Sequence, residues 1–145
     1  MPRSGDKIQF FTNGIKYSLP ERSATRKWLN RVARFHGKKI VALNYIFVTD
    51  KILHQMNKQF LNHDTLTDII TFPNNSGNSQ LEGEIYISIE RVRENANEFR
   101  QLLKTELARV MAHGLLHLCG FSDKSVKQQK EMRSQEEKAL DLRTR

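Results

Sequence analysis

Apolar residues in this chain alternate between short strand-like runs and longer segments in which they recur every three or four positions. Runs rich in β-branched and aromatic residues predict strands at residues 39–49, 67–72 and 81–88. Two further runs, 8–11 and 15–19, flank the sequence Thr-Asn-Gly, whose composition is typical of a turn. These two runs fit either a hairpin or one bent strand, so about four strands are expected.

Helical spacing of apolar residues predicts about five helices around these strands. We expect them from Glu21 to about residue 36, from Asp50 to about 62, from Ser88 to about Leu103, from about Thr105 to Gly120, and over 125–145. Asp50 and Ser88 are the expected caps, because their side chains can accept hydrogen bonds from free backbone N–H groups. The mixture predicts an α+β fold, with a small mixed sheet packed against helices.

The same spacing identifies the core-facing side chains of two of these helices. In the first helix they are Trp28, Val32 and Phe35. In the last, highly charged helix, the few apolar anchors are Val126, Met132, Ala139 and Leu142.

The composition is that of an ordinary globular protein. The 145 residues, 38% of them hydrophobic, suffice for one core but not two, so a single domain over residues 1–145 is expected. No segment approaches the roughly 20 apolar residues that span a bilayer, and the first residues lack the apolar run of a secretory signal. We therefore expect a cytoplasmic protein without a membrane partner. The only cysteine, Cys119, excludes an internal disulfide.

Positive charge is concentrated in one segment. The chain has 24 Lys and Arg against 16 Asp and Glu, and residues 21–39 contain seven basic residues and a single acidic one. Four of the basic residues form one stripe at helical spacing, beside the core face: Lys27, Arg31, Arg34 and Lys38. The stripe fits contacts to nucleic-acid phosphates, and a solvated surface helix explains it equally well.

Candidate chemistry lies in the sequence HGLLHLCGFSDK, residues 113–124. His113 and His117 stand one above the other on a helix, so both can reach one ion at the roughly 2.0 to 2.1 Å that zinc requires. Gly120 permits a left-handed turn that folds the chain back, which makes Asp123 the nearest anionic ligand. Two histidines and one carboxylate leave a coordination position for water, as in catalytic metal sites.

Other interpretations of this segment stay open. The histidines can be ordinary polar side chains, since two histidines four apart often occur without a metal. Cys119 is a poor ligand because it points to another helix face. Glu106 shares the helical stripe of His113 and is either a base or supporting partner or, more simply, a surface residue. Zinc peptidases place a glutamate after the first histidine, where this chain has Gly114.

Three blocks resemble the YbeY endoribonucleases, bacterial rRNA maturation factors. HGLLHLCGF at 113–121 is similar to the family signature HGxLHLxGYDH, TDIITFP at 67–73 to its TDVLSFP, and GEIYIS at 83–88 to its GDIxIS. The resemblance implies an α+β fold and a zinc-dependent RNase specific for single strands. It also implies a role in maturation of the 16S rRNA 3′ end and in ribosome quality control, with precursor rRNA and the small ribosomal subunit as partners.

Two positions depart from the family pattern. The family has its third histidine ligand ten residues after the first, whereas this chain has Asp123. A carboxylate favours harder ions than imidazole does, and one Zn²⁺ per chain remains the expected cofactor. The family's arginine shortly before the TD block is replaced by Leu61, and His63 is the candidate substitute. His63 and Glu106 are accordingly the candidate catalytic residues.

The leading hypothesis is a metal-dependent endoribonuclease with ligands His113, His117 and Asp123, in which the basic stripe holds the RNA backbone. A ribosome-assembly factor with a mainly structural metal and little hydrolytic activity is the alternative. A hydrolase acting on another substrate, including peptides, ranks third, because Gly114 counts against it.

Overall fold

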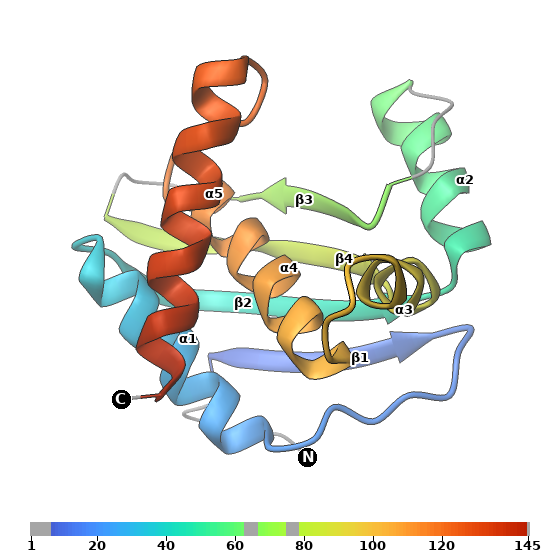
Figure 1. Ribbon diagram of the computed structural model, residues 1–145, viewed down its shortest axis with the longest axis horizontal. Helices are drawn as coiled ribbons and strands as arrows, with labels where there is room; N and C mark the ends of the chain where they lie inside the picture. Colours follow the sequence, from blue (N-terminus) through green and yellow to red (C-terminus); the bar gives the residue numbers. More distant parts are fainter. Residues whose placement is uncertain (1–6, 63–66, 75–78, 145) are drawn as a thin grey trace.

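The computed structural model describes residues 7–62, 67–74 and 79–144, which form one four-stranded sheet and five α-helices (Figure 1). The strands are β1 (Ile8–Asn13), β2 (Lys39–Val48), β3 (Ile69–Pro73) and β4 (Gln80–Ser88). The helices are α1 (Arg22–Phe35), α2 (Asp50–Leu61), α3 (Ile89–Glu98), α4 (Leu103–Leu118) and α5 (Val126–Asp141), and a short 3-10 turn, η1 (Leu142–Thr144), follows. The predicted α+β fold is confirmed. None of the described helices is long and apolar enough to cross a membrane.

The sheet is mixed, with strand order β1-β2-β4-β3. β2 runs parallel to both β1 and β4, while the short β3 pairs antiparallel with β4. The central strand β2 ends in a continuous buried apolar run, as the sequence predicted for residues 39–49. β4 instead alternates, with Glu82 and Glu84 between buried Leu81, Gly83 and Ile85.

Alternate side chains of the strands serve two separate clusters. Tyr45, Phe47, Ile85 and Ile87 belong to the main core under α1, α3, α4 and α5. Ile46 and Ile70 belong to a smaller cluster with Leu53 of α2. Since neighbouring residues of a strand point to opposite faces, α2 packs on the face opposite the main core. Figure 1 shows α1, α4 and α5 lying across the front of the sheet.

The second predicted strand, residues 15–19, does not form. This segment runs outside the sheet from the end of β1 toward α1, and it pairs with no strand of the described chain. Leu19 is buried, and Ile15 and Tyr17 pack against the main core. The alternation in the sequence therefore reflects packing against the core rather than pairing in a sheet.

Two helix boundaries differ from the prediction. Thr49, not Asp50, caps α2, with its hydroxyl accepting from the Ile52 N–H at 3.2 Å. Asp50 instead pairs with Arg91 at 2.6 Å. The predicted cap Ser88 is confirmed, but α3 ends at Glu98 rather than near Leu103. Arg100 has a left-handed φ of 55°, which separates α3 from α4, and α4 begins at Leu103.

Two predicted core anchors lie at helix ends and are exposed. Phe35, in the last turn of α1, is 58% exposed, and Val126, the first residue of α5, is 69% exposed. Trp28 and Val32 are buried as expected, and so are Met132 and Ala139. Helical spacing identified the correct faces, but it cannot tell where the core beneath a helix ends.

Candidate metal centre

Both histidines lie on α4, the helix that packs most deeply against the sheet. Gly114, between them, makes this close approach possible. A Cβ atom there would stand 2.9 Å from Ile85 Cδ1 and 3.0 Å from Ile69 Cδ1. Even a methyl group would be crowded at the position where a zinc peptidase carries its glutamate, because that position faces the sheet rather than the metal centre.

Asp123 is delivered to the histidines by the way α4 ends. Gly120 adopts a φ of 108°, as the sequence predicted, and the Phe121 N–H donates to the Leu116 carbonyl at 3.1 Å. The chain then turns back and immediately enters α5 through a capping box at Ser125. Gln128 accepts from the Ser125 N–H at 3.0 Å and donates its own N–H to the Ser125 hydroxyl at 3.0 Å. The loop that carries Asp123 is thereby fixed at both ends.

The three predicted ligand atoms converge on one point. His113 Nε2 lies 3.0 Å from His117 Nε2 and 3.2 Å from Asp123 Oδ2, and His117 Nε2 lies 3.5 Å from the same oxygen. Ligands at about 2.0 to 2.1 Å from an ion at the centre of a regular tetrahedron stand about 3.3 to 3.4 Å apart. Two imidazole nitrogens and one carboxylate oxygen at these separations fit a divalent ion such as zinc. Cys119 is not part of this group.

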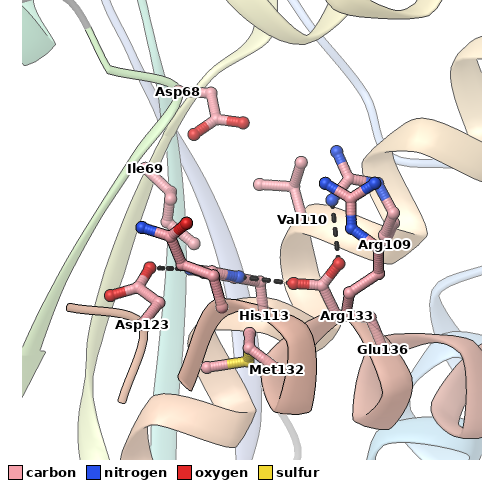
Figure 2. A pocket seen from close by; sticks show the side chains of 10 residues that line it. Asp68, Ile69, Arg109, Val110, His113, Asp123, Met132, Arg133 and Glu136 are labelled. Carbon is pink, nitrogen blue, oxygen red and sulfur yellow. Dashed lines mark hydrogen bonds and ion pairs between the residues drawn. The ribbon is translucent and has the colours of Figure 1, made fainter. Parts of the chain in front are cut away.

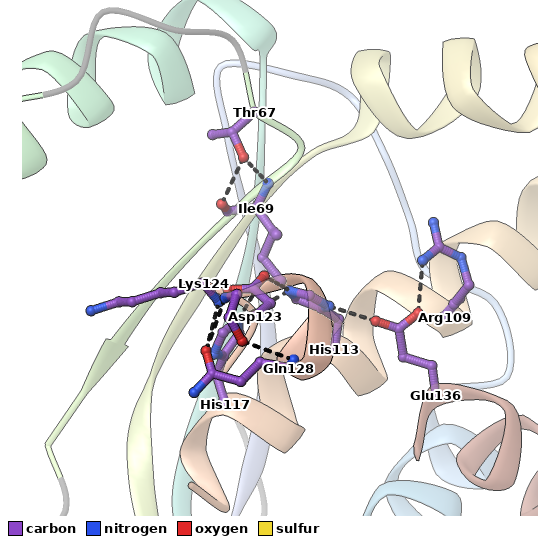
Figure 3. Close-up of polar contacts among 10 residues, drawn as sticks. Thr67, Ile69, Arg109, His113, His117, Asp123, Lys124, Gln128 and Glu136 are labelled. Carbon is purple, nitrogen blue, oxygen red and sulfur yellow. Dashed lines mark hydrogen bonds and ion pairs between the residues drawn. The ribbon is translucent and has the colours of Figure 1, made fainter. Parts of the chain in front are cut away.

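A partly buried ionic network lies behind His113. Its Nδ1 is 2.6 Å from Glu136 Oε2 on α5, and Arg109 donates to Glu136 Oε1 at 2.9 Å (Figure 3). Arg109 also forms an ion pair with Glu106 one turn earlier on α4. Glu106 is only 2% exposed, so its interpretation as a surface residue is wrong. Glu106 is held by Arg109 and contacts none of the three ligand side chains.

These contacts shift the pKa values of the site. Burial lowers the pKa of His113, but the hydrogen bond and charge of Glu136 outweigh burial and leave that pKa raised. For His117, burial and the charge of His113 lower the pKa. Burial raises the pKa of Glu136, yet His113 and Arg109 reverse the effect, so its pKa lies below the usual value. Glu136 is therefore a carboxylate in the neutral pH range.

A pocket of about 270 Å³ opens beside His113 and Asp123 (Figure 2). It is also lined by Asp68, Arg109 and Arg133. Burial raises the pKa of Asp68, which makes this side chain a candidate for proton transfer. Arg109 is neutralised by two glutamates, whereas Arg133 forms no ion pair with any residue in the described part of the chain. Of the two arginines that line the pocket in the described part of the chain, Arg133 is thus the one available to a ligand.

The other predicted site residues lie outside this cluster. Lys27 and Arg34 are exposed on α1, but Arg31 donates to the Leu142 carbonyl at 2.7 Å and so helps to hold the end of the chain. We call residues 119–125, which connect α4 to α5 and carry Asp123, the metal loop. The end of α1 lies close to this loop, because the ring of His36 packs 5.2 Å from that of Phe121. Lys38, the last residue of the stripe, lies two positions after His36. His63 lies outside the described residues.

Comparisons with known proteins agree with this architecture. The family model described as Endoribonuclease YbeY matches residues 9–143. The Endoribonuclease YbeY of Cytophaga hutchinsonii is 47% identical over 138 residues, covering 95% of this chain and 96% of the relative. That of Flavobacterium psychrophilum is 45% identical over 132 residues, covering 91% and 94%. The solution structure of TM1509 from Thermotoga maritima superposes with a TM-score of 0.66 at 28% identity, covering 94% and 88% of the two chains. The chain belongs to the YbeY endoribonuclease family.

Proposed function

We propose that this protein is a zinc-dependent endoribonuclease that hydrolyses phosphodiester bonds in single-stranded RNA. The observation that carries the proposal is the convergence of His113 Nε2, His117 Nε2 and Asp123 Oδ2 beside an open pocket. Membership of an endoribonuclease family supplies the substrate class. When bound, a divalent ion at this point acts as a Lewis acid toward the phosphate group.

Two residues of the pocket bind the phosphate group and accept a proton. Arg133 binds a phosphate oxygen, since a phosphodiester requires a cation and Arg109 is already paired with two carboxylates. Asp68 accepts the proton of the attacking nucleophile, because the other carboxylates lining the pocket are engaged with His113, His117 or Arg109. Glu106 is already paired with Arg109, and His63 stays a prediction.

RNA reaches this pocket along α1. Lys27, Arg34 and Lys38 contact the phosphate backbone, which brings little sequence preference because phosphates are alike along the strand. The contact between His36 and Phe121 joins this stripe to the metal loop. We further propose, from the family resemblance, that the substrate is the 3′ end of precursor 16S rRNA in the cytoplasm, with a role in ribosome quality control.

The test is cleavage of a labelled single-stranded RNA by the purified protein, with the matching duplex as comparison. We expect His113→Ala and His117→Ala to abolish cleavage, and chelation followed by zinc addition to remove and restore it. His54→Ala is the matched control, because His54 lies on α2 outside the metal group. Equal cleavage by metal-free and zinc-loaded protein would refute the proposal.

The same chelation experiment separates the enzyme from an assembly factor with a structural metal. The side chains of His113 and Asp123 are both partly exposed to solvent, so the fold should survive removal of the ion. Far-UV circular dichroism should therefore stay unchanged while cleavage stops. Unfolding on chelation would instead favour the structural role.

A further inference from the structure

We propose that Glu136 is the positioning residue that aims His113 at the metal ion, and that Arg109 holds Glu136 in place for this task. This inference rests on the proposed function, because it concerns the same metal centre. It assigns a role at that centre to α5, a helix that contributes none of the three ligands.

The first support is the direction of the His113 ring. Its Nδ1 faces Glu136 Oε2 at 2.6 Å, so its Nε2 faces His117 and Asp123 at 3.0 and 3.2 Å. A carboxylate acceptor keeps the proton of a neutral imidazole on Nδ1 and leaves Nε2 free to bind a cation. One hydrogen bond thus selects both the orientation and the tautomer that a metal ligand needs.

The second support is that the two oxygens of Glu136 have different partners. Oε2 meets His113, while Oε1 accepts from Arg109 Nη1 at 2.9 Å. Glu136 is 4% exposed, and a carboxylate so deeply buried requires partners that compensate for lost water. Arg109 alone would satisfy only one oxygen. Because the bond to His113 also joins α5 to α4, the experiment must separate a positioning role from a purely structural clasp between these helices.

The third support is that Arg109 is itself fixed. Its guanidinium also pairs with Glu106 on α4. Arg109 is therefore held by one carboxylate from α4, Glu106, and one from α5, Glu136. The imidazole, the carboxylate and the guanidinium therefore have few alternative rotamers. Partners of this kind behind a metal ligand typically change metal affinity about 10- to 100-fold.

The test measures zinc affinity by competition with a chromophoric chelator, below the melting temperature of each protein. We expect Glu136→Gln to weaken zinc binding by at least about tenfold, since the amide keeps the shape but loses the charge. Glu137→Gln is the matched control, because it removes the same charge from the next, exposed residue of α5. It should bind zinc as the wild type does.

A purely structural clasp predicts a different result. In that case Glu136→Gln lowers the melting temperature of the metal-free protein but leaves zinc affinity unchanged in the folded protein, which would overturn the proposal. Wild type that binds zinc and cleaves RNA would then still support the proposed function. Wild type that binds no zinc would overturn both.

A second measurement needs no variant and decides the matter if Glu136→Gln does not fold. Nitrogen-15 NMR of the zinc-loaded wild type reports which ring nitrogen of His113 carries the proton. We expect a protonated Nδ1 whose proton exchanges slowly, because it lies in the bond to buried Glu136. Coordination of the metal through Nδ1, or rapid exchange of this proton, would overturn the proposal.

Discussion

Gly114→Ala is expected to destabilise the protein although it replaces a glycine in the middle of a helix. The new methyl carbon would lie 2.9 Å from Ile85 Cδ1 and 3.0 Å from Ile85 Cγ2, against ordinary carbon separations of about 3.5 to 4.0 Å. Ile85 is completely buried, and its Cγ2 does not move when the end of the side chain rotates. α4 must therefore lift from the sheet.

Two opposing free energies decide the sign of this change. Alanine is favoured over glycine inside a helix by about 1 kcal/mol. Inserting a methyl group into a packed core costs about 1 to 3 kcal/mol. The free energy of unfolding should therefore fall by about 1 kcal/mol, which lowers the melting temperature of a chain of this length by about 3 °C.

Urea and thermal unfolding of the metal-free protein measure this effect. The double variant Gly114→Ala/Ile85→Val provides the internal control, because valine lacks the Cδ1 atom that lies closest to the new methyl. The double variant should lose less unfolding free energy than the sum of the losses of the two single variants. A rise in melting temperature for Gly114→Ala would show that helix propensity dominates and that the contact with Ile85 does not constrain α4.

Three further predictions concern single side chains. Arg133→Ala should weaken RNA binding and reduce the slope of log affinity against log salt by about 0.7, the value for one phosphate contact on a single strand; an unchanged slope would contradict the assignment. Tyr45→Phe should cost about 1 kcal/mol in urea unfolding, because the Tyr45 hydroxyl donates to the buried Met111 carbonyl at 2.8 Å. Burial raises the pKa of Cys119 to about 11, so alkylation at pH 8 should be slow until urea unfolds the chain.

The ligand set could be predicted from the sequence because its geometry is local. One helix spaces His113 and His117, and a turn at Gly120 brings Asp123 back within a few residues. Helix periodicity and the left-handed preference of glycine are properties of short segments.

The supporting residues could not be predicted in the same way. Glu136 lies 23 positions from His113 and meets it only because α5 packs against α4. Asp68 directly precedes β3, the edge strand next to β4, and reaches the pocket from there. Helical spacing allows the pair of Glu106 with Arg109, but the burial of Glu106 depends on how α4 packs. Contacts between elements depend on tertiary packing, which a spacing rule does not contain.

The fold was predictable to a similar depth. Strand 39–49 was found from its run of β-branched and aromatic residues and strand 81–88 from its alternation of apolar and polar residues, and both became central strands. Residues 15–19 carry an alternation that suits a strand as well as a segment lying on the core. The structure decides between them: residues 15–19 pack on the core and pair with no strand of the described chain, although β1 is an edge strand.

The position of Trp28 gives this protein a built-in optical reporter. Its indole N–H donates to the Ala139 carbonyl at 2.8 Å, and the guanidinium of Arg143 lies 5.5 Å from its ring. The chain has no other tryptophan, and this one is 4% exposed. Release of the final helix would let water reach the indole and shift its emission to longer wavelength. Fluorescence can therefore follow, without any label, whether the helix that bears Glu136 stays docked.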